Sequence, residues 1–413
     1  MTTMTMTSKP TFSTWIVWLL AALMLLSFAP SANAKKDKKK DAPAQQEAPK
    51  QPTVDTSKLV WPQPPDVARI RWLNELRGEQ APPEPAQPDK KKKQKWMDRL
   101  AGVQQQDVTK VSLVHYLAKP YGVAVDSKGR VYVADTYVAA VFIFDLETKK
   151  VDFIRNGLEA KFKDIVGLAL DDNDRLFVTD AALHQVSVFD ANHKVEAVFG
   201  ADELVRPGGV AIDPENRLLY VVDTEKEHVL VYDADSFKRL RTIGGPAKSE
   251  GDEDPGVFAK PTNIALDPDG NLYVSDTINN RIQIFDADGN FISMFGKAGD
   301  GPGYFARPKG VAIDGDGHVW VADAMQGRVQ IFDKQGHVLA YFGTPGMLTG
   351  QLGLPTGLAI DKLNRVIVSE QLKGRIQVFR YTTESEAAAE KAERQGKAAA
   401  VAAKQPQTAG EKK

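Results

Sequence analysis

Short apolar runs separated by turn-forming residues recur six times between Pro120 and Phe379. The fourth copy shows the pattern clearly, because its first two runs flank a turn at 268–271 in which Gly270 can take the positive φ of a tight hairpin. Short runs rich in Val, Ile, Tyr and Phe between such turns are typical of β-strands. Each copy therefore predicts four antiparallel strands, which in the fourth copy cover residues 263–267, 272–275, 281–285 and 291–295.

An acidic residue ends the second run of every copy, and its positions give the repeat length. The successive differences are 45, 43, 53, 47 and 47 residues, between Asp135, Asp180, Asp223, Asp276, Asp323 and Glu370. A strand-rich repeat of this length is typical of propeller blades. One four-stranded sheet with apolar residues on both faces cannot bury them alone, so the copies must pack around a common axis. The sequence predicts an all-β, six-bladed β-propeller of four-stranded antiparallel blades.

Three short motifs recur in the copies, and the fifth copy carries them most completely. Residues 308–314 read Pro-Lys-Gly-Val-Ala-Ile-Asp, residues 321–323 read Val-Ala-Asp and residues 328–332 read Arg-Val-Gln-Ile-Phe. These motifs resemble those of the NHL-repeat family, whose members form six-bladed propellers, here of an exported bacterial type. The first three copies depart from the family pattern, because Ala140, Gln185 and His228 replace the arginine that begins the third strand.

The sixth copy lacks a fourth strand, which would leave one blade edge unpaired. The segment 69–76, upstream of the first copy, has the composition of a strand and occupies the place that a fourth strand takes before the next blade. We therefore expect a closing strand within 67–78 that completes the sixth blade. This interpretation sets the propeller at 67–381, with an insertion at 79–111 that carries a short helix.

The segments outside the propeller predict export and tethering. Residues 15–28 are apolar and precede Ala32-Asn33-Ala34, which is typical of a signal peptide (1–34) cleaved after Ala34. An uncleaved anchor is the alternative. We expect a periplasmic or secreted protein with no transmembrane segment in the mature chain, a disordered basic, proline-rich linker at 35–66 and a disordered Ala/Glu/Lys tail at 382–413.

Composition limits the chemistry and the partners. The chain has no cysteine, which excludes disulfides and cysteine-ligated cofactors. Its net charge of −1 conceals an uneven distribution: residues 119–381 hold about 29 basic and 38 acidic residues, leaving about 24 basic and 16 acidic residues in the flanks. An acidic propeller argues against a nucleic-acid partner. We expect a protein or cell-envelope polymer as partner, with weak membrane or wall association through the basic flanks.

The loops between strands two and three and the connections between blades emerge on one face, which we call the ligand-binding face. These loops vary from copy to copy and combine aromatic, arginine and asparagine residues, a composition common in interfaces. For Asp276 with Arg281, Asp323 with Arg328 and Glu370 with Arg375, two roles stay open: a clasp within the blade or a contact with ligand. The candidate binding residues are Tyr121, Tyr137, Asn279, Asn280, Arg281, Lys309, Arg328 and Arg375.

Catalytic chemistry is not indicated by the sequence. Enzymes of similar fold include amidating lyases with histidine-bound zinc and lactonases with calcium, but neither ligand set maps onto matching positions here. The Asp-rich segments at 267–270, 286–289 and 314–317 lack the spacing of a calcium loop and lead directly into strands, so we interpret them as hairpin turns. We expect a non-enzymatic binding protein with no catalytic residue, metal or cofactor. The alternative is a propeller hydrolase or lyase, lactonase-like or amidating-lyase-like, with an unrecognised metal site.

Overall fold

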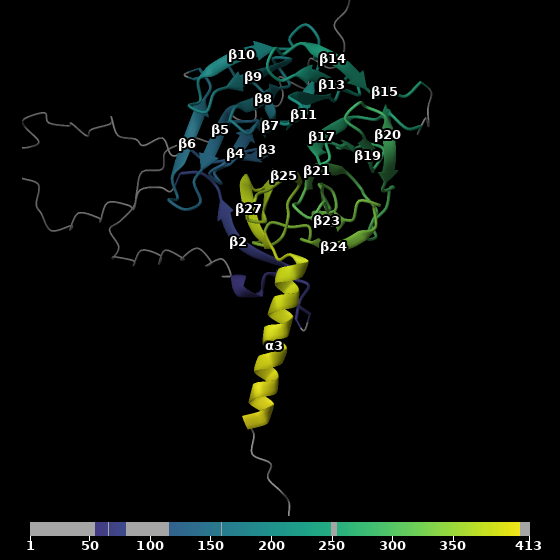
Figure 1. Cartoon of the computed structure of the whole chain (residues 1–413). Helices are drawn as coiled ribbons and strands as arrows, with labels where there is room; N and C mark the ends of the chain where they lie inside the picture. Colours follow the sequence, from purple (N-terminus) through teal and green to yellow (C-terminus); the bar gives the residue numbers. More distant parts are fainter. Residues whose placement is uncertain (1–53, 65, 80–114, 158, 249–253, 405–413) are drawn as a thin grey trace, which may run out of the picture. The chain divides into compact units, whose positions relative to one another are not determined.

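The computed structural model describes residues 54–64, 66–79, 115–157, 159–248 and 254–404, which belong to one compact unit beginning at Val54. Six antiparallel sheets are arranged in a ring (Figure 1), so the six-bladed propeller is confirmed. The predicted signal peptide (1–34) and residues 80–111 of the predicted insertion lie outside the described residues.

Each blade has its first strand innermost and its fourth strand outermost. The first blade contains β3 (Pro120–Val125), β4 (Val131–Asp135), β5 (Ala140–Phe144) and β6 (Val151–Arg155). The second contains β7 (Ile165–Leu170), β8 (Leu176–Asp180), β9 (Gln185–Phe189) and β10 (Val195–Phe199), and the third β11 (Pro207–Asp213), β12 (Leu218–Asp223), β13 (His228–Asp233) and β14 (Arg239–Ile243). The fourth contains β17 (Pro261–Leu266), β18 (Leu272–Asp276), β19 (Arg281–Phe285) and β20 (Phe291–Phe295), and the fifth β21 (Pro308–Ile313), β22 (Val319–Asp323), β23 (Arg328–Phe332) and β24 (Val338–Phe342). A short parallel pair, β15 (Gly245–Pro246) with β16 (Val257–Phe258), joins the third blade to the fourth.

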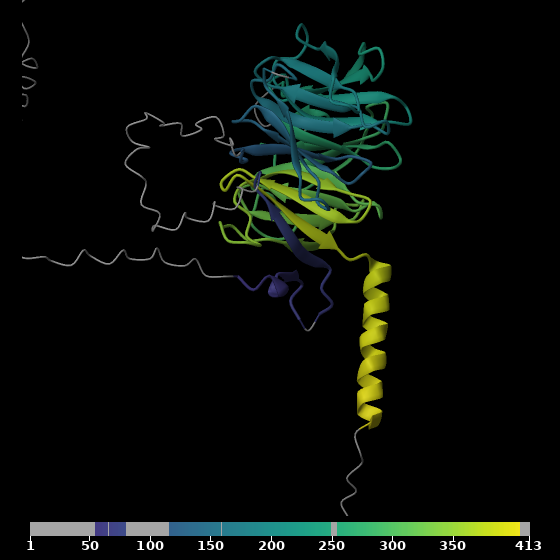
Figure 2. The same ribbon diagram turned by 90° about the vertical axis from the view of Figure 1, so that its left-hand side faces the viewer.

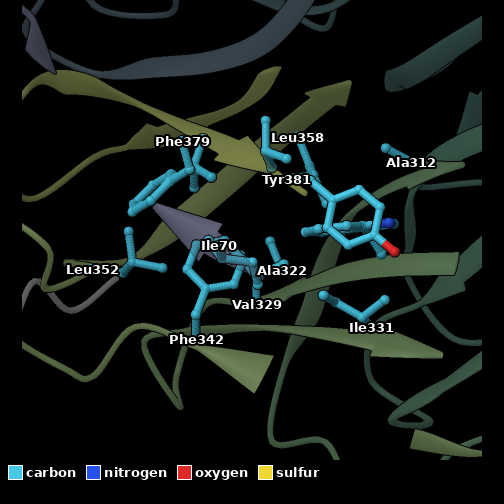
Figure 3. Close-up of a cluster of buried hydrophobic side chains, with 13 residues drawn as sticks. Ile70, Ala312, Ala322, Val329, Ile331, Phe342, Leu352, Leu358, Phe379 and Tyr381 are labelled. Carbon is cyan, nitrogen blue, oxygen red and sulfur yellow. The ribbon is translucent and has the colours of Figure 1, made fainter. Parts of the chain in front are cut away.

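The sixth blade takes its outer strand from the N-terminal part of the chain, as predicted. It contains β25 (Pro355–Ile360), β26 (Arg365–Glu370) and β27 (Arg375–Tyr381). Strand β2 (Ile70–Leu76) lies beside β27 (Figure 2). The two strands pair antiparallel, with Trp72 opposite Phe379 and Leu76 opposite Ile376. The buried side chain of Ile70 lies among Phe342, Phe379 and Tyr381 (Figure 3), so the closing strand also fills the core between blades five and six.

Part of the segment predicted as a disordered linker is ordered in the structure. Residues Thr56–Lys58 form the short 3-10 helix η1, and β1 (Val60–Trp61) pairs with β2 as a fifth strand of the sixth blade. The Trp61 ring centre lies 5.8 Å from that of Phe342 and 5.9 Å from that of Phe379. The aromatic contacts of Trp61 and the backbone hydrogen bonds from Arg69 to Trp61 (2.7 Å) and from Trp72 to Leu59 (2.9 Å) therefore hold this end of the segment against the sixth blade.

The segment predicted as a disordered tail contains a helix, α3 (Glu384–Lys404). Thr383 and Glu386 form a capping box, because Glu386 N donates to Thr383 Oγ1 (3.3 Å) and Thr383 N donates to Glu386 Oε2 (2.9 Å). Arg71 binds Glu390 at 3.1 Å. Alanine, glutamate and lysine have high helix propensity, so the cap and the ion pairs to Arg69, Arg71 and Arg380 favour the helix without an apolar stripe. No described helix is long and apolar enough to cross a membrane.

The backbones of neighbouring blades approach closely along the innermost strands. A Cβ atom on Gly122 would collide with the carbonyl oxygen of Val166 in the next blade, and one on Gly357 would collide with that of Tyr121. The second of these contacts joins the sixth blade to the first. Glycine at this position therefore permits the close packing of strands that closes the ring.

The acidic residues that end the second strands are structural. Asp135 is fully buried, and its carboxylate accepts hydrogen bonds from the backbone N–H groups of Ala118 (2.6 Å), Lys119 (2.9 Å), Tyr137 (3.0 Å) and Val138 (2.9 Å). It thereby joins the connection that enters the blade to the loop between strands two and three. Both segments contribute to the ligand-binding face, so this carboxylate fixes the loops that carry the candidate site.

Candidate functional site

A cavity of about 350 Å³, which we call the central cavity, opens at the ligand-binding face. All six blades contribute to it, chiefly from the starts of the innermost strands and the residues that follow the buried acids. Its lining consists of Lys119, Tyr121, Thr136, Asp164, Val166, Ala181, Arg206, Pro207, Gly208, Thr224, Thr262, Lys309 and Gln371.

Lys309 reaches across the cavity from the fifth blade to the first. Its Nζ lies 3.4 Å from Tyr121 Oη and 5.1 Å from the centre of the Tyr121 ring. The intervening sixth blade has Thr356 at the corresponding strand position, and this small side chain is 1% exposed. The lysine therefore passes over a short neighbour, and its ammonium group is held by a cation–π contact.

Asp164 is the carboxylate among the cavity-lining residues, and Arg206 lies beside it. Arg206 Nη2 is 3.6 Å from Asp164 Oδ2. Burial raises the pKa of Asp164, and the nearby Asp180 adds to this effect while Arg206 opposes it. With Lys119 and Lys309, the lining holds three cations and one carboxylate, a net charge of +2 when Asp164 is ionised.

Two of the predicted binding residues, Tyr121 and Lys309, line the central cavity. Tyr137 is 74% exposed in the loop between β4 and β5, and Lys119 Nζ lies 5.9 Å from the centre of its ring. Asn279 and Asn280 support the corresponding loop of the fourth blade: Asn279 Nδ2 donates to Asp276 Oδ2 (2.9 Å) and Asn280 Nδ2 donates to the carbonyl of Ile278 (3.0 Å).

Arg281 and Arg375 are buried and form clasps within their blades. Arg281 Nε donates to Asp276 Oδ2 at 2.8 Å, and Arg375 Nε donates to Glu370 Oε1 at 2.8 Å. Arg375 is 0% exposed and also binds Glu75 of β2 at 2.7 Å. Of the two roles left open by the sequence, the structure shows the clasp at both positions.

Arg328 behaves differently from its counterparts. Its Nη2 donates to the backbone carbonyls of Asp300 (2.8 Å) and Gly301 (2.9 Å), and its guanidinium carbon lies 5.4 Å from the centre of the Tyr341 ring. In the part of the chain that the structure describes, no ion pair joins Arg328 to Asp323. Arg328 therefore holds the connection between blades four and five in place and does not form a clasp within its own blade.

Sequence reasoning missed Lys119, Asp164 and Arg206 as cavity residues. Each directly precedes an innermost strand, and a charged residue occupies this place in five of the six copies, with Lys260 and Arg307 as the others and Leu354 as the exception. This recurrence was a usable signal. It does not reveal which charges are available, because Lys260 is bound by Glu225 (3.2 Å) and Glu227 (3.7 Å).

The opposite end of the ring has a second cavity, of about 500 Å³, formed by the hairpin turns that join strands one and two. Two of the Asp-rich segments, 267–270 and 314–317, form hairpin turns there, as interpreted from the sequence: Asp267 Oδ1 accepts hydrogen bonds from the N–H groups of Asp269 and Asn271, each at 2.9 Å. Asp314 Oδ2 accepts from Trp320 Nε1 at 2.9 Å. Among the described residues, no group of three or more His, Cys, Asp or Glu side chains is arranged to hold a metal ion.

Comparisons with known proteins agree with this architecture. Residues 117–144 match the NHL repeat model, residues 159–248 match a model described as a 6-bladed beta-propeller, and residues 256–349 match the SMP-30/Gluconolactonase/LRE-like region. A probable peptidyl-alpha-hydroxyglycine alpha-amidating lyase from Caenorhabditis elegans is 35% identical over 106 residues. That match covers 25% of this chain and spans 29% of the lyase.

Two solved structures show the likeness in fold. A gluconolactonase from Xanthomonas campestris is 19% identical with a TM-score of 0.50, covering 64% of this chain and 89% of that one. An auxiliary nutrient binding protein from Bacteroides thetaiotaomicron is 14% identical with a TM-score of 0.51, covering 64% and 69%. With the observed sheets, these matches identify the chain as a six-bladed β-propeller with NHL-type repeats.

Proposed function

We propose that this protein is an exported, non-enzymatic propeller that binds a protein or cell-envelope polymer through its ligand-binding face, with the central cavity as the anchoring point. The observation that carries the proposal is the contrast between a repeated framework and a varied cavity. The second residue of the innermost strand varies among the blades, with five residue types in six positions, while Pro or Ile precedes it. These residues are Tyr121, Val166, Gly208, Thr262, Lys309 and Thr356.

The chemistry of the two ends of the ring supports the choice of face. The central cavity combines Tyr121 and Arg206, which are residue types that anchor ligands in interfaces, with the cation of Lys309. The opposite cavity is lined by hairpin residues whose carboxylates, such as Asp267, already accept hydrogen bonds within their own turns. More polar and charged side chains are therefore available to bind a specific ligand at the ligand-binding face.

Site-directed photocrosslinking in intact cells tests this proposal. A photoreactive residue replaces Tyr137, which is 74% exposed beside the central cavity, and in a matched control it replaces Leu363, which is 62% exposed in a hairpin at the opposite end. We expect a defined adduct from position 137 that is absent from position 363 and is lost when Lys309→Met is added. Equal labelling from both positions, or none from 137, contradicts the proposed face.

N-terminal sequencing of the purified protein tests the proposed cleavage after Ala34.

A hydrolase or lyase is the second candidate, favoured by the match of residues 256–349 to the gluconolactonase-like region and by the lyase that is 35% identical over 106 residues. The discriminating measurement is the metal content of the purified protein, together with turnover of lactones, esters and peptidyl-hydroxyglycine. One equivalent of zinc or calcium with turnover that depends on it favours the enzyme. A protein that binds its ligand without turnover favours the binding propeller.

A further inference from the structure

We infer that the central cavity binds a small oxyanion, a carboxylate or phosphate group of the ligand, and that Lys119, Arg206 and Lys309 are the residues that hold it. This inference rests on the proposed function, because it names the chemistry of the group that enters the ligand-binding face.

The charge of the cavity is opposite to that of its surroundings. The lining carries three cations and one carboxylate, whereas residues 119–381 have an excess of about nine acidic residues. A concave, partly desolvated site focuses the field of the charges that line it. The mouth of the ring is therefore a local positive centre on an acidic propeller, and an anion is attracted there rather than to the blades.

The cations at the cavity are available to a ligand. Within the described residues, neither Lys119 nor Lys309 forms an ion pair, and Arg206 is joined to Asp164 at 3.6 Å through one nitrogen. A guanidinium has five N–H donors, so Arg206 keeps donors that can bind both oxygens of a carboxylate or phosphate. Lys260, which holds the same place in the fourth blade, is by contrast bound by Glu225 and Glu227.

The position of Lys309 is fixed before any ligand arrives. Its ammonium lies over the Tyr121 ring and within 3.4 Å of the Tyr121 hydroxyl, so less side-chain freedom is lost when an anion binds. The cavity volume of about 350 Å³ lies near the lower end of the range for small-molecule sites, which is roughly 300–1,000 Å³. This size suits one charged group with the unit that carries it, not a length of polymer.

Titration of the full purified protein with sulfate, inorganic phosphate and acetate tests the inference, with binding followed by calorimetry and by NMR. We expect all three probes to compete for one site. The double variant Lys119→Met with Lys309→Met weakens binding by about tenfold or more, because charge-assisted hydrogen bonds are lost. The matched control is Lys362→Met, which removes a lysine from the cavity at the opposite end and leaves the affinity unchanged. Equal affinity in wild type and double variant overturns the inference, and a thermal melt of each variant excludes unfolding.

A polymer experiment distinguishes a free anion from a polymer-borne one. Polygalacturonate carries carboxylates on a sugar chain, and its methyl ester is the uncharged control. Binding of the acid but not the ester, with loss in the double variant, assigns the cavity to a polymer-borne carboxylate. Binding of the free ions alone assigns it to a small anionic ligand. If the adduct at position 137 forms and is lost with Lys309→Met, while sulfate, phosphate and acetate bind equally to wild type and the double variant or to neither, the oxyanion inference fails and the proposed function stands.

Discussion

Arg375 shows how one side chain joins the two ends of the propeller. It is fully buried, binds Glu370 within β26 and also binds Glu75 of the closing strand. Burial raises the pKa of Glu370, although the hydrogen bond from Arg375 opposes this effect. The guanidinium therefore compensates a carboxylate that would otherwise lie uncharged or unpaired in the protein interior.

Replacement of Arg375 by methionine is expected to destabilise the protein by about 3–5 kcal/mol, because it leaves Glu370 buried without its cation. The matched control is Arg328→Met, at the same strand position in the fifth blade, where the lost contacts are hydrogen bonds to two carbonyls. We expect a loss of about 1–3 kcal/mol there. Urea unfolding monitored by tryptophan fluorescence measures both, and an equal loss would argue against the clasp.

Anion binding at the central cavity should depend on pH through Asp164. Burial raises the pKa of this carboxyl above its ordinary value, with Asp180 contributing and Arg206 opposing. As the pH falls through that raised pKa, Asp164 loses its negative charge and the cavity becomes more positive. Sulfate affinity should therefore increase on acidification, since sulfate itself does not titrate in that range. The Asp164→Asn variant should bind sulfate more tightly and lose this pH dependence, and a retained dependence would point to another group.

Among the elements, the closing strand β2 makes a contribution to stability that single substitutions can measure. Its burial is greatest at Ile70 and least at Leu73 and Asn74, where its pairing with β27 shifts register between Trp72 and Asn74. Ile70 is 1% exposed within the core cluster of blades five and six, whereas Leu73 of the same strand is 46% exposed. The strand thus fills the core and pairs with β27 at the same time.

Ile70→Ala is expected to cost about 2–5 kcal/mol, because it removes buried methyl groups and leaves a cavity among Phe342, Phe379 and Tyr381. The control, Leu73→Ala, removes a comparable volume from a half-exposed position and should cost less than about 1 kcal/mol. Thermal and urea unfolding report the difference. Similar values for the two variants would mean that β2 is not part of the cooperative core.

The ring as an assembled unit depends on the approach of one innermost strand to the next. The strand neighbours run in sequence from β3 through β7, β11, β17, β21 and β25, and β25 contacts β3 to complete the circle. At that last junction Gly357 faces the carbonyl of Tyr121. The packing there joins residues that are distant in the chain, so its loss affects closure rather than one blade.

Gly357→Ala should destabilise the propeller by about 1–3 kcal/mol, because the added methyl group must displace the backbone of the first blade. Gly315→Ala is the matched control: nothing lies within 4 Å of its added Cβ atom, so its effect should stay within about 0.5 kcal/mol. Limited proteolysis alongside thermal unfolding tests whether the first variant also opens the ring. A stability unchanged by Gly357→Ala would contradict this view of closure.

The repeat pattern was sufficient to predict the blades, but only part of the candidate site. Glycine at the position of Gly310 recurs in five of the six copies, and an acid at the position of Asp323 recurs in all six, so the sequence reveals both positions. Tyr121 and Lys309 were predicted as binding residues separately, but their contact joins the first and fifth blades. The roles of Arg281 and Arg375 depended on burial, which the spacing to their acidic partners does not reveal.

The sequence by itself determined the number of blades, the order of strands within them, the closing strand and the turn role of the Asp-rich segments. These features follow from local periodicity and turn-forming residues, and each copy of the repeat shows both independently. Tertiary structure alone decided which charges gather at the mouth of the ring, because Lys119, Arg206 and Lys309 lie far apart in the chain and meet only when the ring closes. It also decided that parts of the two terminal segments are ordered, because Trp61 contacts Phe342 and Glu390 binds Arg71, and both of these partners belong to the propeller.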